Sequence, residues 1–174
     1  MKKTNLLLII FVSLIILLSR FIPHLPNFSP LASIFLFIGV YTNNKKYLIL
    51  PLLALLASDF FIGFYHIGIM LSVYGSFSLI ALLGTLLKKH LNAINTITSS
   101  LAASLLFFLL TNFAVWYFGD WYSHSLSGLT LSYTLAIPFF KSTLFSNVLY
   151  TTLFFGAYES LKYFYQQKIL SATK

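Results

Sequence analysis

The segment Tyr47-Leu-Ile-Leu-Pro-Leu-Leu-Ala-Leu-Leu-Ala-Ser-Asp59-Phe-Phe-Ile-Gly-Phe-Tyr65 places one carboxylate inside a long apolar run. A membrane-spanning helix needs ~20 mostly apolar residues, and this run has about that length. A charge within hydrocarbon costs at least ~2.5–3.5 kcal/mol on insertion scales, so it usually faces a partner or a water-filled cavity. The segment therefore predicts a membrane helix, and Asp59 is the first candidate functional residue.

The rest of the chain is equally poor in charge. Its 174 residues are 59% hydrophobic and 8% charged, whereas soluble domains carry roughly 25% charged residues. This length predicts one domain, residues 1–174, with room for about six spanning helices and little else. The chain has no cysteine, which excludes disulfides and thiolate metal sites.

Apolar runs separated by polar breaks predict an all-α integral membrane protein, a bundle of six transmembrane helices. The expected helices span residues 5–22, 30–42, 47–65, 67–87, 97–118 and 134–163. The second is only ~20 Å long, so it must be tilted, or extended by irregular backbone that the protein shields. The first resembles a signal peptide but lacks a small-x-small cleavage site, and we expect it to be retained.

Basic residues alternate along the connections. Nine of the eleven fall before the first helix, after the second and fourth, or at the end of the sixth, while the connections 23–29, 64–67 and 119–133 contain none. The positive-inside rule then places both termini and the lysine-bearing connections in the cytoplasm. The net charge of +8 is thus a topology signal, and we expect no nucleic acid as a partner.

Ionisable groups gather at the outer side of this arrangement. Asp59 is twelve residues after Tyr47, or ~18 Å from the cytoplasmic end of its helix. Arg20 ends the first helix, and Lys141 is expected about two turns into the sixth. One interpretation is a binding cavity open to the outside. The alternative is an ion pair of Asp59 with Lys141 or Arg20 that only locks helices together.

The fifth helix carries a second candidate face. Asn112 and Trp116 are four residues apart, so they share a face near the outer end. They would contact a ligand as a polar anchor and an aromatic wall, or serve packing only. Asn147 is deeper and is expected to be structural. Small residues at four-residue spacing, Thr152, Gly156 and Ser160 among them, predict close helix packing or docking of a separate subunit.

Motifs of catalysis are missing from the sequence. It contains no His-Glu-x-x-His, no glycine-rich phosphate loop and no Gly-x-Ser-x-Gly, which are the patterns of zinc hydrolases, nucleotide-binding enzymes and serine hydrolases. Its four histidines lack metal-ligand spacing. We therefore expect neither an enzyme nor a bound cofactor or metal.

Several runs of sequence together resemble an uncharacterised bacterial membrane family described as transport proteins. They are Arg20-Phe-Ile-Pro-His-Leu-Pro-Asn27-Phe-Ser-Pro30, the stretch from Pro51 to Gly63, Phe107-Phe-Leu-Leu-Thr-Asn112-Phe-Ala-Val-Trp116, Gly128-Leu129, and Ala136-Ile-Pro-Phe-Phe-Lys141. That family is in turn similar to the substrate-binding, or S, subunits of energy-coupling-factor (ECF) transporters. The resemblance implies six helices in the bacterial cytoplasmic membrane and capture of a small molecule from outside. It also implies delivery with a membrane coupling subunit and ATPases.

The sequence thus predicts a membrane protein that binds a small, vitamin- or nutrient-like solute. The candidate binding residues are Arg20, Asn27, Asp59, Asn112, Trp116 and Lys141. Arg20 or Lys141 would hold an anionic group, Trp116 would cover a ring, and Asp59 would accept a donor or fix a basic side chain. Two alternatives remain: a structural subunit that scaffolds a membrane complex, and a proton-coupled carrier in which Asp59 titrates.

Overall fold

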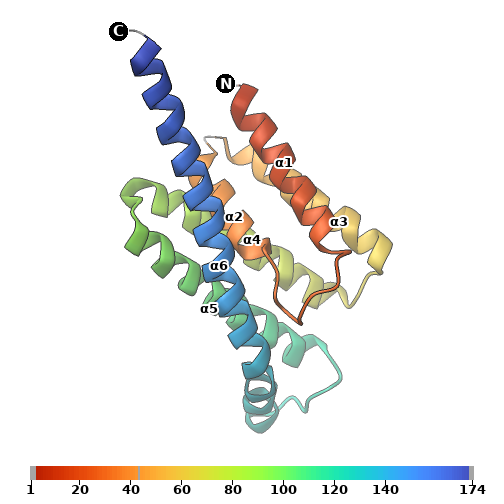
Figure 1. Cartoon of the computed structure of the whole chain (residues 1–174). Coiled ribbons are helices and arrows are strands. Elements are labelled where there is room, and N and C mark those ends of the chain that lie inside the picture. Colours follow the sequence, from red (N-terminus) through yellow and green to blue (C-terminus); the bar gives the residue numbers. More distant parts are fainter. Residues whose placement is uncertain (1–2, 43, 173–174) are drawn as a thin grey trace.

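The computed structural model describes residues 3–42 and 44–172, and this part of the chain is helical apart from its connections. Its six α-helices are joined by loops and two short 3-10 helices (Figure 1). The bounds are α1 Lys3–Ser19, α2 Leu31–Tyr41, η1 Lys45–Leu48, α3 Ile49–Ile62, α4 Ile67–Leu87, η2 Lys88–His90, α5 Ala93–Phe118 and α6 Leu126–Ala172. The predicted all-α class and six helices are confirmed for these residues.

The short helix α2 forms the core of the bundle. All its residues from Leu31 to Val40 are buried, and it packs against α1, α4, α5 and α6. The ring of Phe35 stacks on that of Phe77 in α4 with centroids 4.8 Å apart. A helix that is apolar on every side is one that the protein encloses. Its shortness is compatible with this position, because the other helices surround it.

Two glycines let α2 and α4 approach each other closely. A Cβ added at Gly39 would lie 2.0 Å from the carbonyl oxygen of Ala81, and one added at Gly84 would lie 2.3 Å from that of Leu36. Real Cβ atoms do not tolerate such distances, so any side chain here would push the helices apart. The close helix packing of small residues therefore lies at the crossing of α2 and α4. The sequence pointed instead to a stripe on α6, and the residues of that stripe, Thr152, Gly156 and Ser160, are exposed.

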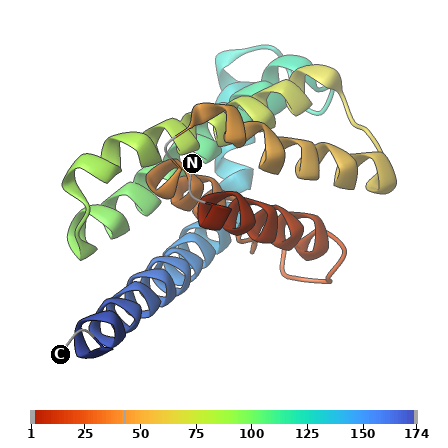
Figure 2. The same ribbon diagram turned by 90° about the horizontal axis from the view of Figure 1, so that it is seen from above.

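Helices α1 and α3 form a pair at one side of the bundle (Figure 2). α3 ends at Ile62, three residues before the predicted end, because Gly63 adopts a φ of +114°. Only glycine enters this backbone region readily. Asp59 consequently lies in the last turn of α3, at the end of the bundle near the connection 63–66.

The last helix is longer than the sequence predicts. α6 begins at Leu126, eight residues before the expected start at Thr134, and runs to Ala172. The Oγ of Ser125 accepts a hydrogen bond from the backbone N–H of Gly128 at 3.2 Å and stabilises its first turn. The expected loop 119–133 is therefore only 119–125. The C-terminal part of α6 projects beyond the other helices (Figures 1 and 2).

The connections divide between the two ends of the bundle. In Figure 1, α1 begins and α6 ends at the upper end, whereas the connections 20–30, 63–66 and 119–125 lie toward the lower end. These three connections are the ones that the sequence predicts to be external.

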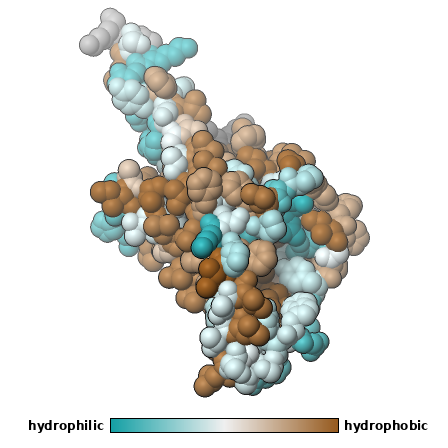
Figure 3. Space-filling view, turned by 60° about the horizontal axis from the view of Figure 1, so that its bottom comes forward, coloured by the Kyte–Doolittle hydropathy of each residue, from teal (hydrophilic) through white to brown (hydrophobic). Residues whose placement is uncertain are grey.

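Much of the face seen in Figure 3 is apolar, with polar residues between the apolar areas. Large hydrophobic side chains are exposed on α1, α3, α4 and α5; examples are Phe11, Phe61, Leu71 and Leu105. Two stretches, Ile67–His90 and Ala93–Phe118, are long and apolar enough to cross a membrane. α1, α2 and α3 have 17, 11 and 14 residues, fewer than the ~20 of a complete span.

Candidate functional site

The segment between α1 and α2 positions the first two candidate residues. Prolines at 23, 26 and 30 prevent it from continuing either helix. A turn closed by a 2.9 Å hydrogen bond from Phe28 N–H to the Leu25 carbonyl places Asn27 at a φ of 58°. Asparagine tolerates this left-handed conformation better than most residues. The segment crosses the lower end of the bundle, with Arg20 at its start and Asn27 near its end.

Asp59 is the centre of a three-residue cluster. Its side chain is 1% exposed and forms an ion pair through Oδ1 with Nη2 of Arg20. Its Oδ2 accepts a 2.7 Å hydrogen bond from the Tyr74 hydroxyl in α4. Both carboxylate oxygens therefore have partners, as a buried charge requires. The cluster ties the end of α1 to α3 and α4, and we call it the Arg20–Asp59–Tyr74 cluster.

The partner of Asp59 is Arg20 and not Lys141. Because α6 begins at Leu126, Lys141 lies fifteen residues into the helix rather than about two turns. Its side chain is exposed on the surface of α6. The sequence left both partners open, and the packing of α1 beside α3 decides between them.

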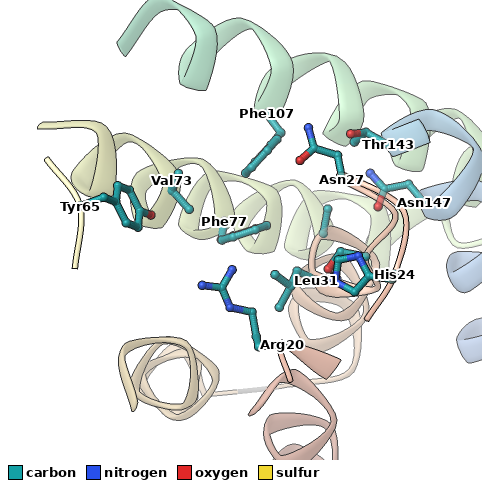
Figure 4. Close-up of a pocket in the computed structure, with 12 residues that line it drawn as sticks. Arg20, His24, Asn27, Leu31, Tyr65, Val73, Phe77, Phe107, Thr143 and Asn147 are labelled. Carbon is teal, nitrogen blue, oxygen red and sulfur yellow. The ribbon is translucent and has the colours of Figure 1, made fainter. Parts of the chain in front are cut away.

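A cavity of about 260 Å³ lies beside the cluster (Figure 4). Its lining residues come from α2, α4, α5 and α6, together with the connections 20–30 and 63–66. They are Arg20, His24, Asn27, Ser29, Leu31, Ala32, Tyr65, Val73, Phe77, Phe107, Thr143 and Asn147. The rings of Phe77 and Phe107 stack with centroids 5.1 Å apart and make the apolar wall. We call this space the first cavity.

The polar groups at the cluster's edge of the first cavity are mainly donors. Arg20 lines it, whereas Asp59 lies behind and does not. The Arg20 Nε is buried and has no hydrogen-bond partner among the described residues. Partial burial, reinforced by the charge of Asp59 and opposed by that of Arg20, raises the pKa of Tyr65 to about 12. Tyr65 therefore keeps its hydroxyl proton at neutral pH and is also a donor.

A second cavity of about 240 Å³ adjoins the first. Both are lined by Asn27, Val73, Phe107 and Thr143. The remaining lining of the second cavity is mostly apolar and comes from α4, α5 and α6: Ile69, Phe108, Thr111, Asn112, Val115, Ala136, Phe139 and Phe140. The Asn112 amide nitrogen donates to the Phe108 carbonyl of its own helix at 2.8 Å, and Asn112 is the polar residue that the sequence predicted on this face.

Trp116 lies one turn further toward the end of α5. Its Nε1 donates a 3.0 Å hydrogen bond to the Ser123 carbonyl, and its ring lies 5.9 Å from that of His124. These contacts hold the connection 119–125 against α5. Trp116 does not line the first or the second cavity.

A buried hydrogen-bond network forms the inner end of the first cavity. The side-chain amide nitrogen of Asn147 donates to Ser104 Oγ at 2.7 Å. Ser33 Oγ donates to the backbone carbonyl of Asn147 at 3.0 Å. Thr151 Oγ1 donates to Ser33 Oγ at 3.1 Å. The network joins α2, α5 and α6 and gives Asn147 the cross-linking contacts expected of a structural amide.

The structure thus brings together four of the six predicted residues. Arg20, Asn27 and Asn112 line the two cavities, and Asp59 holds Arg20 from behind; Trp116 and Lys141 lie elsewhere. Tyr74 was missed because no sequence pattern links one tyrosine in α4 to Asp59. Phe77 and Phe107 were missed because single aromatics in apolar helices carry no signal. Among the described residues, no three His, Asp or Glu side chains gather into a potential metal site.

The comparisons with known proteins give a family but no function. A family of unknown function, DUF6580, matches residues 1–169. This covers nearly the whole chain, and the chain belongs to that family. No curated protein and no solved structure matches the chain.

Proposed function

We propose that this DUF6580 chain is a multi-pass protein of the bacterial cytoplasmic membrane that binds a small solute from the outer side. The apolar α4 and α5 and the exposed hydrophobic side chains on other helices favour a lipid environment, because soluble proteins rarely expose large apolar patches. The lysine-bearing connections are cytoplasmic under the positive-inside rule, and both termini lie on that side.

The observation that carries the proposal is the first cavity beside the Arg20–Asp59–Tyr74 cluster. It combines stacked aromatic walls with a charged side chain whose position is fixed by a buried carboxylate. Mostly apolar pockets with a few placed polar groups are typical of small-molecule sites. Ion pairing before a ligand arrives also preorganises the guanidinium.

The cavity lies near the connections that the topology places outside. Its lining includes residues of 20–30 and 63–66, and neither 23–29 nor 64–67 contains lysine or arginine. A solute would therefore enter from the external side, between these two connections. Arg20, Asn27 and Asn112 would contact it, and Asp59 would act as a positioning residue.

Any ATP-driven transport would need partner chains. The sequence has no glycine-rich phosphate loop of the kind that holds ATP. We propose a membrane coupling subunit with ATPases as that partner, on the ground of the sequence runs that resemble a family similar to S subunits of ECF transporters. Capture of the solute would then be the task of this chain, and release would be the task of the assembly.

Analysis of co-purified small molecules tests the proposal. The full chain would be purified in lipid nanodiscs, and mass spectrometry would identify molecules bound to it. We expect one reproducible compound on the wild type and on Lys141→Gln, which removes a positive charge outside both cavities. We expect its loss from the double variant Arg20→Gln/Asp59→Asn, which removes the guanidinium without leaving a buried unpaired carboxylate.

Two outcomes would overturn solute binding at this site. One is equal occupancy of the wild type and the double variant. The other is repeated absence of any bound compound while partner proteins co-purify, which would favour a structural subunit.

A further inference from the structure

We infer, on the premise of the proposed function, that the solute is an amphipathic monocarboxylate. Its carboxylate is bound by Arg20 in the first cavity, and its apolar body passes Phe107 into the second cavity. The inference depends on three features: the unused donors of Arg20, the single charge of that side chain, and the four lining residues that the two cavities share.

The first feature is an unsatisfied hydrogen-bond donor. Of the Arg20 nitrogens, Nη2 bonds to Asp59, while Nε is buried without a partner among the described residues. A buried donor that lacks an acceptor is costly, and native proteins rarely leave one. A carboxylate oxygen can accept more than one hydrogen bond, and in this structure those of Asp59 accept from Nη2 of Arg20 and from the Tyr74 hydroxyl. The Arg20 side chain also lines the first cavity and is 27% exposed. A bound molecule can therefore supply further acceptors to the guanidinium, and carboxylates match the fork of an arginine best.

The second feature limits the charge of the solute. Arg20 is the cation at this edge of the first cavity, and the charge of Asp59 balances its charge. A dianion such as a phosphate monoester would bring one more uncompensated negative charge into the site than a carboxylate does. A cation would face the guanidinium and find no free acidic oxygen in the lining. Among anions, a single carboxylate gains charge-assisted hydrogen bonds with the least imbalance of charge.

The third feature gives the solute its apolar body. The cavities of about 260 and 240 Å³ share Asn27, Val73, Phe107 and Thr143. Small-molecule sites commonly measure ~300–1,000 Å³, so each cavity alone falls short and both together suit one ligand. The lining of the second cavity away from Arg20 is dominated by Phe108, Val115, Ala136, Phe139 and Phe140. Such walls favour a ring or a short alkyl chain.

A charge series of matched probes tests the head group. Phenylbutyrate, phenylbutyramide and phenylbutylamine share one body and differ only at the polar end. We would measure their binding to the full chain in nanodiscs by the shift of its unfolding temperature. We expect saturable binding of phenylbutyrate, at least about tenfold weaker binding of the amide, and none of the amine. Equal binding of amide or amine, or no binding of phenylbutyrate, would overturn the inference.

A cavity-filling variant tests the apolar body. Ala136 is 9% exposed and lines the second cavity, so Ala136→Phe should weaken phenylbutyrate while leaving the shorter benzoate unaffected. The matched control is Ala102→Phe, which adds the same ring on an exposed surface of α5 and should change neither. Unchanged phenylbutyrate binding in Ala136→Phe would contradict the two-cavity assignment.

The head-group inference can fail while the proposed function stands. A co-purified compound that is neutral or cationic, and that leaves with the Arg20→Gln/Asp59→Asn double variant, would keep the site and refute its ligand class. A compound that binds the double variant as well as the wild type would refute both.

Discussion

Removing one member of the Arg20–Asp59 pair should destabilise the protein unequally. Arg20→Gln leaves the Asp59 carboxylate 1% exposed, with Tyr74 as its remaining donor. Breaking a buried pair in this way costs ~3–5 kcal/mol. Asp59→Asn should cost less, about 1–3 kcal/mol, because the Arg20 side chain is 27% exposed and its unpaired charge can reach water.

The double variant separates pairing from independent roles. Arg20→Gln/Asp59→Asn leaves two neutral amides in place of two charges. We expect it to be more stable than Arg20→Gln alone, because the uncompensated buried charge is gone. The interaction energy from this double-mutant cycle should be about 1–3 kcal/mol, the upper range for residues in direct contact.

Reversible unfolding of the purified chain, followed by circular dichroism in detergent with increasing denaturant, would measure these differences. Asp59→Asn combined with Lys141→Gln is the control, and it should recover no stability, since Lys141 is exposed on α6. If the losses of unfolding free energy in Arg20→Gln and Asp59→Asn simply added up in the double variant, the ion-pair account of the cluster would be refuted.

The helix crossing, the α5 end and the topology give three further predictions. Gly39→Ala should destabilise by about 1–3 kcal/mol or more through overpacking, whereas Gly156→Ala, whose added Cβ meets nothing within 4 Å, should be neutral or stabilising in the same unfolding assay. Trp116→Ala should speed proteolysis within 119–125 while phenylbutyrate binding persists; loss of binding with an intact connection would make Trp116 a binding wall. Ser125→Cys should react with an impermeant thiol reagent in intact cells, and protection of this cysteine would reverse the orientation.

Helix positions were largely predictable because apolar runs and polar breaks are local features. α4 was predicted with the bounds that the structure gives, 67–87. α6 was predicted to start too late, because hydropathy detects apolar residues rather than helix. Residues 126–133 are partly polar, yet they form the first two turns of α6. The hydrogen bond from the Gly128 N–H to Ser125 Oγ stabilises the start of this helix. α3 was predicted to end too late, because the backbone conformation of Gly63 is not visible in composition.

The candidate site was predictable in its charges but not in its pairing. A buried acid and an arginine at a helix end stand out in any apolar sequence, and Asp59 and Arg20 were found in this way. Their contact depends on how α1 packs beside α3, which no local pattern specifies. Trp116 shares a helix face with Asn112, but it lies one turn further along α5. Asn112 therefore lines the second cavity, whereas Trp116 contacts the connection 119–125.

The sequence by itself determined the all-helical class, the approximate helix bounds and the short, apolar character of α2, because each follows from residues close together in the chain. It also determined which connections carry lysine. Only the tertiary structure decided that α2 is the core, that Gly39 and Gly84 meet, and that Arg20 rather than Lys141 neutralises Asp59. It also decided that Asn27 and Phe107 line both cavities. These contacts join residues far apart in sequence, and their distances are set by the packing of whole helices.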